Sequence, residues 1–384
     1  MSKRALALLL AIFTGTALAQ PEAAHRGVPH LDHVFIIMME NHHISQILGN
    51  PNAPFINSYT ATANLANNYF GVGHPSLTNY LEVVGGSNFG IVNDFSPDWH
   101  NTACVSNIES DTVSNEASTA NICPIAGSGM DAPTPAVDTT NEGTPQEPVF
   151  NDPLPAAFTQ GISIADQLVA ANRTWRAYQE NLPPYGADGV NNSDGLVSDK
   201  AGTPSEPGMP KFYAVKHDPF VYFASVQSGS DRELSLRNVT DFHQLFADLK
   251  SGHVANFNFI TPNQCHDQHG RGSGEVGPGC SVDQNTIAQG DAALNILIST
   301  IKGSHAWKEG NNVIVTVWDE NDFSSLPNQV LAIVDTNYSS GGKISNVKYN
   351  HFSLLKTIEA GFGLSFINHA ADDNVKLMTD LFGR

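Results

Sequence analysis

The chain has 384 residues, of which 41% are hydrophobic and 15% charged, a composition that suits one large α/β domain with a buried core. Its 19 Lys and Arg stand against 38 Asp and Glu, and the formal net charge of −19 gives no basic face for a nucleic acid. We therefore expect no nucleic-acid binding. A small phosphate ester is not excluded, because a metal ion and a few histidines can hold a phosphate locally.

The first residues have the layout of a cleaved secretory signal. Lys3 and Arg4 precede an apolar segment, and Ala17-Leu18-Ala19 stands before Gln20. We assign residues 1–19 to a signal peptide and residues 20–384 to a single exported domain, periplasmic or extracellular. No later apolar run approaches the roughly 20 residues of a membrane helix, so no transmembrane segment is expected.

The first predicted strand is the apolar run over residues 33–39, which ends abruptly at Glu40 and Asn41. A run without polar alternation is typical of a parallel strand that is covered on both faces. Ligands of open α/β sheets collect beyond the carboxyl ends of such strands. The two polar residues are therefore candidates for a site.

A short helix is predicted within residues 53–68, and a second helix runs from Pro75 to the Gly85-Gly86 pair. Ser76 then lies in the first helical turn. Unpaired backbone N–H groups and the positive end of the helix dipole favour an anion at that position. Serine is also a common helix cap, so this residue alone does not identify a nucleophile.

Two polar segments rich in Gly and Pro, residues 98–153 and 186–210, are interpreted as surface insertions, the second at the rim of the site. Four cysteines in an exported chain suggest two disulfides. Proximity in sequence favours the pairs Cys104–Cys123 and Cys265–Cys280.

Helices and strands alternate through the rest of the chain, and polar residues follow several strands. A capping-box helix that begins at Ser163 precedes a strand at 174–178, which leads to Asn181. A short strand at 211–215 leads to His217. These two residues join the candidates for a site.

A helix capped by Thr240 ends at Gly252, and the strand at 254–260 that follows it leads to Asp267 and His269. A long helix then carries Asp291 on its apolar face, a conflict that the sequence does not explain. The remaining predicted elements are that helix from Ser281 to Gly303, strands at 313–318 and 329–334, a helix capped by Asn350 and a final helix at 373–382. This alternation indicates an α/β fold with a mostly parallel central sheet and helices on both faces.

Two strand ends far apart in the sequence deliver hard oxygen ligands to one sheet edge. Glu40 and Asn41 follow the first strand, and Asp319 and Glu320 follow the strand at 313–318. Three carboxylates and one amide would repel one another without a cation, so we predict a site for one or more divalent metal ions. Such ligands favour Ca²⁺, Mg²⁺ or Mn²⁺, although the geometry could admit Zn²⁺. For either pair alone, helix caps or loop acids are an equally simple explanation.

The polar groups after the strands also suit phosphoryl transfer. A metal can orient a serine hydroxyl such as that of Ser76 for in-line attack. The candidates that stabilise the remaining phosphoryl charge are His217, His269 and the amides of Asn79 and Asn181.

Eight short motifs follow one another between about Leu31 and Phe382. They are Met38-Met39-Glu40-Asn41-His42, Ala53-Pro54-Phe55-Ile56-Asn57, His74-Pro75-Ser76-Leu77-Thr78-Asn79-Tyr80, Trp175-Arg176-Ala177-Tyr178-Gln179-Glu180-Asn181-Leu182-Pro183, Lys216-His217-Asp218-Pro219-Phe220, Thr261-Pro262-Asn263, Asp319-Glu320 and His351-Phe352-Ser353-Leu354-Leu355-Lys356-Thr357-Ile358-Glu359. Together they resemble the phosphoesterase family, which contains secreted acid phosphatases and bacterial phospholipases C and belongs to the alkaline phosphatase superfamily.

The resemblance implies an alkaline-phosphatase-like fold and a metal-dependent phosphoric ester hydrolase with Ser76 as its nucleophile. It implies phosphate contacts from Asn181, His217 and His269, and metal ligation by Glu40, Asn41, Asp319 and Glu320.

The residues after Glu40-Asn41 separate two branches of that family. His42-His43-Ile44-Ser45 stands where phospholipase-like members carry a Ser-Phe-Asp pattern, which favours an acid phosphatase that acts on phosphomonoesters through a phosphoserine. Thr78 and Gly270 also depart from the family pattern, standing where members often have a proline and an acid. Two alternatives stay open: a phospholipase C-type phosphodiesterase, and a non-catalytic extracellular protein that binds a metal or ligand.

Overall fold

The computed structural model describes residues 27–91, 94, 159–182, 213–229, 233–270, 285–323 and 327–383. The predicted signal peptide, both predicted insertions and the cysteines at 104, 123 and 280 lie outside the described residues. Cys265 is buried, and both disulfide pairings stay predictions. Among the described helices, none combines the length and the apolar character needed to cross a membrane.

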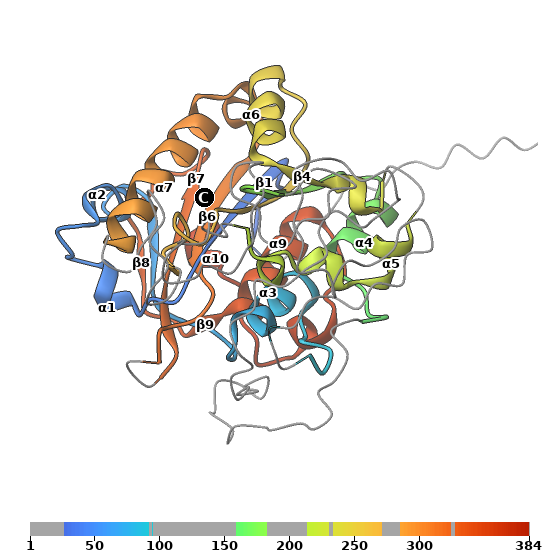
Figure 1. Cartoon of the computed structure of the whole chain (residues 1–384), viewed down its shortest axis with the longest axis horizontal. Coiled ribbons are helices and arrows are strands. Elements are labelled where there is room, and N and C mark those ends of the chain that lie inside the picture. Colours follow the sequence, from blue (N-terminus) through green and yellow to red (C-terminus); the bar gives the residue numbers. More distant parts are fainter. Residues whose placement is uncertain are drawn as a thin grey trace, which may run out of the picture.

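One mixed sheet organises the described part of the chain (Figure 1). Its nine strands follow the order β4-β3-β5-β1-β6-β7-β2-β8, and β9 pairs with β2. The strands are β1 (His33–Met39), β2 (Asn64–Phe70), β3 (Trp175–Gln179), β4 (Val239–Asp241), β5 (Phe257–Thr261), β6 (Asn312–Trp318), β7 (Gln329–Thr336), β8 (Ile344–Ser345) and β9 (Tyr349–Asn350). The five strands from β4 to β6 are mutually parallel, whereas β7 runs antiparallel to both β6 and β2. The predicted fold class is therefore confirmed.

The central position of β1 follows from its sequence. Strand β1 lies between β5 and β6, and all its residues from Val34 to Met39 are fully buried. An unbroken apolar strand is stable only where both of its faces are covered. Its register pairs Met39 with Trp318, so the residues after β1 and β6 emerge side by side at one edge.

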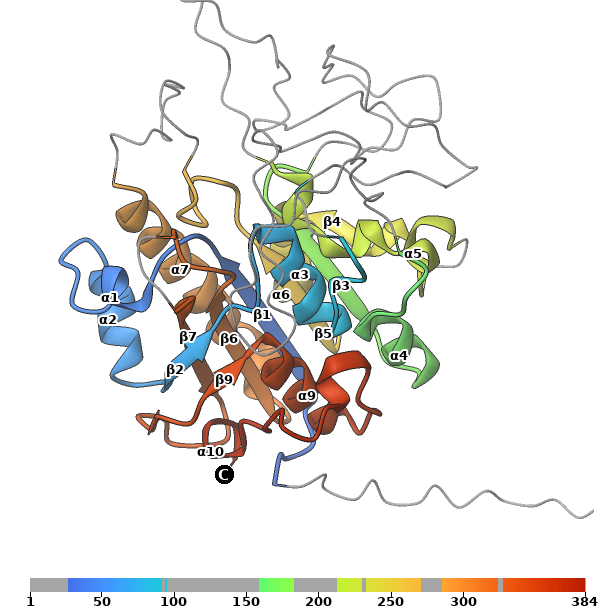
Figure 2. The same cartoon turned by 90° about the horizontal axis from the view of Figure 1, so that it is seen from below.

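Helices cover both faces of the sheet, as Figures 1 and 2 show. One layer contains α3 (Ser76–Gly85), α4 (Ile164–Ala170), α5 (Ala224–Ser228) and α9 (His351–Phe362). The other contains α1 (Ile44–Ile47), α2 (Pro54–Thr60), α6 (Phe242–Ser251), α7 (Thr286–Gly303) and α8 (His305–Lys308), while α10 (Thr379–Phe382) packs against β2, β7 and β8. The described 3₁₀ turns are η1 (Val215–His217), η2 (Pro219–Tyr222), η3 (Leu236–Asn238) and η4 (Asn368–Ala371).

Helix α3, which carries the candidate nucleophile, ends where the sequence predicted. Gly86 closes it at a φ of +68°, in the left-handed region that favours glycine. A Cβ at this position would lie 2.8 Å from the carbonyl oxygen of Ile367, so only glycine fits this close approach. The helix packs against α9 and α4 and is buried along its whole length.

The short helix predicted within residues 53–68 is confirmed as α2, but the sequence did not reveal the strand β2 that follows it. The polar Asn67 and Asn68 of β2 hide the strand pattern and lie at a register shift against β7. Other predicted elements were wrong in type or extent. The predicted strand at 211–215 is not a strand at its described residues 213–215, because Val215 is already the first residue of the 3₁₀ turn η1. Asp241 rather than Thr240 caps α6.

The C-terminal and the long helices also begin later than predicted. Asn285 caps α7, and its side chain accepts a hydrogen bond from the N–H of Ala288, whereas Ser281 lies outside the described residues. The final helix is the single turn α10 rather than the whole of residues 373–382.

Asp291, which conflicted with the apolar face of α7, has a structural role. Its carboxylate accepts hydrogen bonds from the N–H groups of Phe55, at 3.1 Å, and of Ile56, at 2.7 Å. These groups belong to the first turn of α2, which Ala53 leaves without a side-chain cap. Asp291 therefore caps a helix that is distant in sequence, a contact that no local pattern reveals.

Candidate active site

The carboxyl ends of β1 and β6 bring the four predicted metal ligands to one place. The N–H of Asp319 donates to the carbonyl of Met39 at 2.9 Å, which continues the ladder beyond both strands. The N–H of Asn41 donates to Asp319 Oδ1 at 3.1 Å. Asn41 adopts a φ of +51°, and this turn lets the chain leave the sheet directly after Glu40.

Ser76 lies between two carboxylates from different strand ends. Its Oγ is 3.1 Å from Glu40 Oε2 and 3.2 Å from Glu320 Oε1, and the residue is 2% exposed. Pro75 holds the cap position of α3, and no side-chain capping bond is present there. The hydroxyl of Ser76 therefore contacts the acidic cluster and does not cap the helix.

Asn79 fixes the loop that precedes Ser76. Its Oδ1 accepts the N–H groups of Val72 and Gly73, at 2.9 and 3.0 Å, and its Nδ2 donates to Glu320 Oε2 at 3.2 Å. The same Glu320 oxygen lies 2.6 Å from His74 Nδ1. One amide thus couples the loop before Ser76 to the end of β6.

The start of α3 also meets an anionic group. The N–H of Leu77 donates to Asp94 Oδ1 at 3.0 Å, and Lys216 Nζ lies 2.9 Å from Asp94 Oδ2. Lys216 Nζ is also 3.4 Å from His269 Nε2. A carboxylate held by a helix N-terminus and a buried lysine shows that this position, beside Ser76, suits an anion.

His217 lies between Glu40 and a further carboxylate, that of Asp267. Its Nε2 is 3.1 Å from Glu40 Oε1 and its Nδ1 is 3.3 Å from Asp267 Oδ2, although neither contact is aligned as a hydrogen bond. The ring of Tyr80 stacks on the imidazole with centroids 5.1 Å apart, so the ring orientation is fixed. A neutral imidazole carries one N–H and cannot donate to both acids at once.

Burial sets the protonation of this cluster. It raises the pKa of Glu40 well above its ordinary value, and the nearby Asp319 and Asp267 raise it further. The pKa of Asp319 is raised by burial and then by Glu320. Burial lowers the pKa of His217, and the charge of Lys216 lowers it further. All these shifts disfavour the charged forms, and burial is the first cause of each.

The size of the repulsion between the carboxylates indicates that the cluster requires a compensating positive charge. The Glu40 and Glu320 oxygens that flank Ser76 Oγ are within about 6 Å of each other, where two unit charges repel by about 3 kcal/mol at an effective dielectric of 20. Further carboxylates multiply this cost. The buried oxygens Glu40 Oε1, Asp267 Oδ2 and Asp319 Oδ2 have no hydrogen-bond partner. Unpaired buried carboxylate oxygens fit a site for a hard divalent cation.

Glu40, His217 and His269 form a group that could hold a metal ion, because one ligand atom of each lies within 4.8 Å of the others. The sequence had assigned the two histidines to the phosphate and not to a metal. Glu40 belongs to this group and also to the predicted set with Asn41, Asp319 and Glu320. It therefore links two neighbouring positions where a cation is compatible with the side chains.

Asn181 lies apart from the Ser76 cluster. It follows β3, which is separated from β1 by β5, and its Oδ1 accepts a hydrogen bond from Asn263 Nδ2 at 2.8 Å. The neighbouring Glu180 contacts His266 Nδ1 at 2.8 Å. The other predicted residues come together at the ends of β1 and β6, whereas Asn181 belongs to a second polar group further along the same edge.

Sequence reasoning missed the support that His351 gives to Asp319. Its Nε2 is 2.6 Å from the carbonyl oxygen of Asp319, and its Nδ1 is 3.1 Å from the hydroxyl of Tyr69. A carbonyl only accepts, so Nε2 carries the proton and Nδ1 accepts from Tyr69. Burial lowers the pKa of His351 to about 4, which keeps the ring neutral. The signal was present in the sequence, since His351 opens the motif at 351–359.

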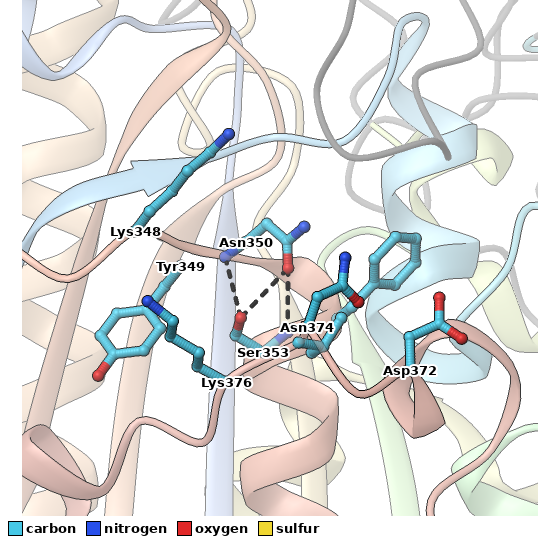
Figure 3. A pocket seen from close by; sticks show the side chains of 9 residues that line it. Lys348, Tyr349, Asn350, Ser353, Asp372, Asn374 and Lys376 are labelled. Atoms are coloured by element: carbon cyan, nitrogen blue, oxygen red, sulfur yellow. Dashed lines mark hydrogen bonds between the residues drawn. The ribbon is translucent and has the colours of Figure 1, made fainter.

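A cavity of about 210 Å³ lies elsewhere, at the start of α9 (Figure 3). Lys348, Lys376 and Asn374 are among the side chains around it, and the dashed lines in the figure join Asn350 to Ser353. None of the residues that line this cavity is a predicted site residue. The cluster around Ser76 lies apart from this cavity and is buried.

Comparisons with known proteins find a matching family and sequence relatives of this chain. The model of the family described as Phosphoesterase family matches residues 50–365. The phosphatidylinositol-3-phosphatase of Mycobacterium tuberculosis is 26% identical over 98% of this chain and 91% of its own length. The phosphate-repressible acid phosphatase of Penicillium chrysogenum is 24% identical over 78% of this chain, which spans about half of that relative, 52%.

Solved structures also match. A protein in the alkaline phosphatase superfamily from Vibrio parahaemolyticus shares 9% identity at a TM-score of 0.43, and the match covers 91% of this chain and 73% of that protein. The assignment of the family rests on the sequence match.

Proposed function

The chain belongs to the Phosphoesterase family and is a phosphoric ester hydrolase, and from this premise we propose that it is an exported, metal-dependent phosphatase for phosphomonoesters. In this proposal Ser76 is the nucleophile and forms a phosphoserine. The observation that carries the proposal is the buried hydroxyl of Ser76, held between Glu40 and Glu320 at the carboxyl ends of the central strands.

The geometry supports a role for Ser76 in covalent catalysis. A serine hydroxyl is a weak nucleophile at its own pKa and needs a neighbouring base or a cation to become reactive. Either flanking carboxylate can accept its proton at hydrogen-bond distance. Oγ would then attack phosphorus as the alcohol leaves, and water would later release the phosphate from the serine.

The carboxylates and histidines around Ser76 suit a divalent cation. Bound there, such an ion would supply charge stabilisation for the phosphoryl oxygens and would favour the deprotonated serine. The residues proposed to hold it are the predicted set Glu40, Asn41, Asp319 and Glu320. His217 and His269 are close enough to Glu40 to join it or to hold a second ion.

The remaining polar groups are proposed to bind the phosphate. The cluster around Ser76 contains His217, His269 and Asn79. At the start of α3, the N–H of Leu77 already donates to the carboxylate of Asp94. A phosphoryl group near Ser76 would meet the same helix end and the same lysine, Lys216. Asn181 would contact a more distant part of the substrate from its position beyond β5.

The names of the relatives support monoester hydrolysis. They are called phosphatidylinositol-3-phosphatase and acid phosphatase, and a phosphatase releases phosphate from a monoester. The alternative of a phospholipase C-type phosphodiesterase has no comparable support. Export is proposed from the predicted signal peptide over residues 1–19.

A substrate panel with several divalent metals tests this function. The purified mature chain, stripped with a chelator and reloaded with Ca²⁺, Mg²⁺, Mn²⁺ or Zn²⁺, should hydrolyse p-nitrophenyl phosphate far faster than bis-p-nitrophenyl phosphate or phosphatidylcholine. The opposite preference would replace the monoesterase by the phosphodiesterase. Equal rates with and without any metal would remove the cation from the proposal.

A further inference from the structure

Phe323 presents an aromatic ring to solvent beside the nucleophile. The residue is 61% exposed, and its ring stacks on His74 with centroids 3.8 Å apart and planes inclined by 25°. His74 itself is only 6% exposed. One face of the phenyl ring is therefore occupied by the imidazole, while much of the rest of the ring faces outward.

The position of this ring is held by the backbone around it. Phe323 adopts a φ of +59°, which is uncommon for a bulky side chain. Its N–H donates to Asn321 Oδ1 at 3.0 Å, and the N–H of Asn321 donates to Asn328 Oδ1 at 2.8 Å. On the other side, Gln46 Nε2 donates to Asp322 Oδ2 at 2.7 Å. These hydrogen bonds hold the backbone that carries the exposed ring, and the stacking on His74 orients the ring itself.

Short contacts connect the ring to the serine. His74 Nδ1 lies 2.6 Å from Glu320 Oε2, and Glu320 Oε1 lies 3.2 Å from Ser76 Oγ. Phe323 follows Glu320 by three residues and so borders the same sheet edge. The other large hydrophobic residues exposed in the described part of the chain lie on other segments: Ile162, Phe246, Ile296 and Ile344.

We propose that Phe323 is a specificity-determining residue that receives the alcohol part of the ester. This inference rests on the function proposed above and names the substrate class: a phosphomonoester whose alcohol carries a flat apolar ring. The phosphoryl group needs the polar cluster, whereas the alcohol must extend away from it toward solvent. An aromatic alcohol that stacks on the open part of the Phe323 ring buries apolar surface and gains an aromatic pair, whereas a polyol gains neither.

The test compares two substrates in matched variants of the full mature chain. Phe323→Ala should lower kcat/KM for phenyl phosphate about 10-fold, equivalent to about 1.4 kcal/mol, mainly by raising KM. For glycerol 3-phosphate the change should stay below about 2-fold. Because each substrate is compared with itself in wild type, the different reactivity of the two leaving groups cancels. Phe323→Tyr should retain the preference, since it keeps the ring.

Ile344→Ala is the matched control, because Ile344 is 65% exposed and lies in β8, away from the cluster. It should change neither substrate. Circular dichroism melting of each variant checks the fold, and Phe323→Leu provides a second variant if the alanine variant melts early. The leucine variant should lose most of the preference for phenyl phosphate, because it keeps an apolar side chain without the ring.

Equal losses on both substrates would overturn the inference, because Phe323 would then act through His74 and Glu320 on the chemical step. Unchanged kinetics in all Phe323 variants would also overturn it, while hydrolysis of either ester by wild type would leave the proposed function standing. A different result would show that the proposed function itself is wrong: wild type would hydrolyse neither monoester with any metal.

Discussion

Replacement of Ser76 by alanine distinguishes a nucleophile from a structural serine. The two roles predict different turnover but a similar loss of stability. The hydroxyl makes one donor bond within the acidic cluster, so Ser76→Ala should cost about 1 kcal/mol of unfolding free energy. A helix cap would cost about the same. As the nucleophile, however, Ser76 carries the covalent path, and its loss should lower kcat at least about 10³-fold, or about 4 kcal/mol of transition-state stabilisation.

Thr78 supplies the matched control within the same helix. Its hydroxyl is as buried as that of Ser76 and donates to the carbonyl of Pro75 at 2.7 Å. Thr78→Ala should therefore lose about 1 kcal/mol of stability and retain nearly full turnover. The assays are urea unfolding followed by circular dichroism and steady-state hydrolysis of p-nitrophenyl phosphate.

Acid quench with a phosphate-labelled substrate tests the covalent step directly. In wild type the label should be trapped on the peptide 71–80, at Ser76. Turnover above a tenth of wild type in Ser76→Ala would refute the assignment. Label on Thr78 would move the nucleophile by two residues, and absence of label with inversion at phosphorus would indicate direct attack by water.

Variants at three further positions test the metal, the scaffold and the pH response. Asp319→Asn keeps an acceptor for the N–H of Asn41 but removes a charge, so the fold should be retained. The bound divalent metal, measured by mass spectrometry, should disappear, and kcat should fall more than about 100-fold. Asp291→Ala should lower the free energy of unfolding in urea by about 2 kcal/mol, because it removes the cap of α2. Asp291→Asn should lower it less, and turnover should be unchanged in both variants. Burial raises the pKa of Glu359 from 4.5 to about 8. The folded state therefore keeps a proton that the unfolded chain releases, and the free energy of unfolding falls as the pH rises from about 4.5 to about 8. Glu359→Gln should flatten that slope and stabilise the protein at pH 8 by about 4 kcal/mol. An unchanged slope would contradict this cause.

Strand ends were the most informative part of the sequence. The unbroken apolar runs before Glu40 and Asp319 are possible only in a sheet covered on both faces, and that requirement alone predicted two central parallel strands. The capping box at Ser163 and the glycine after α3 were equally local and were confirmed. Such signals lie within a few residues of one another and so are readable in a single sequence.

Long-range contacts were beyond the reach of local patterns. The strand β2 is stabilised by pairing with β7 in spite of its polar residues, and the cap that Asp291 gives to α2 crosses from one helix to another. His217 is the last residue of a 3₁₀ turn and does not follow a strand, and it reaches Glu40 because Tyr80 and Asp267 hold its ring in place. A sequence shows such residues as candidates, whereas only their packing shows which groups share a site.

The two aspartates of the cluster share one arrangement that links the fold to its chemistry. In Asp319 and Asp267, one oxygen accepts a backbone N–H, from Asn41 and His269, and the other has no hydrogen-bond partner. The backbone bond fixes the direction of each carboxylate, and the unpaired oxygen keeps its full capacity to bind a cation. Buried and unpaired, these oxygens cost stability, and burial raises the pKa of both acids for the same reason. Such a cost is retained where it serves function, so a bound divalent metal should raise the melting temperature of wild type and should do so much less in Asp319→Asn.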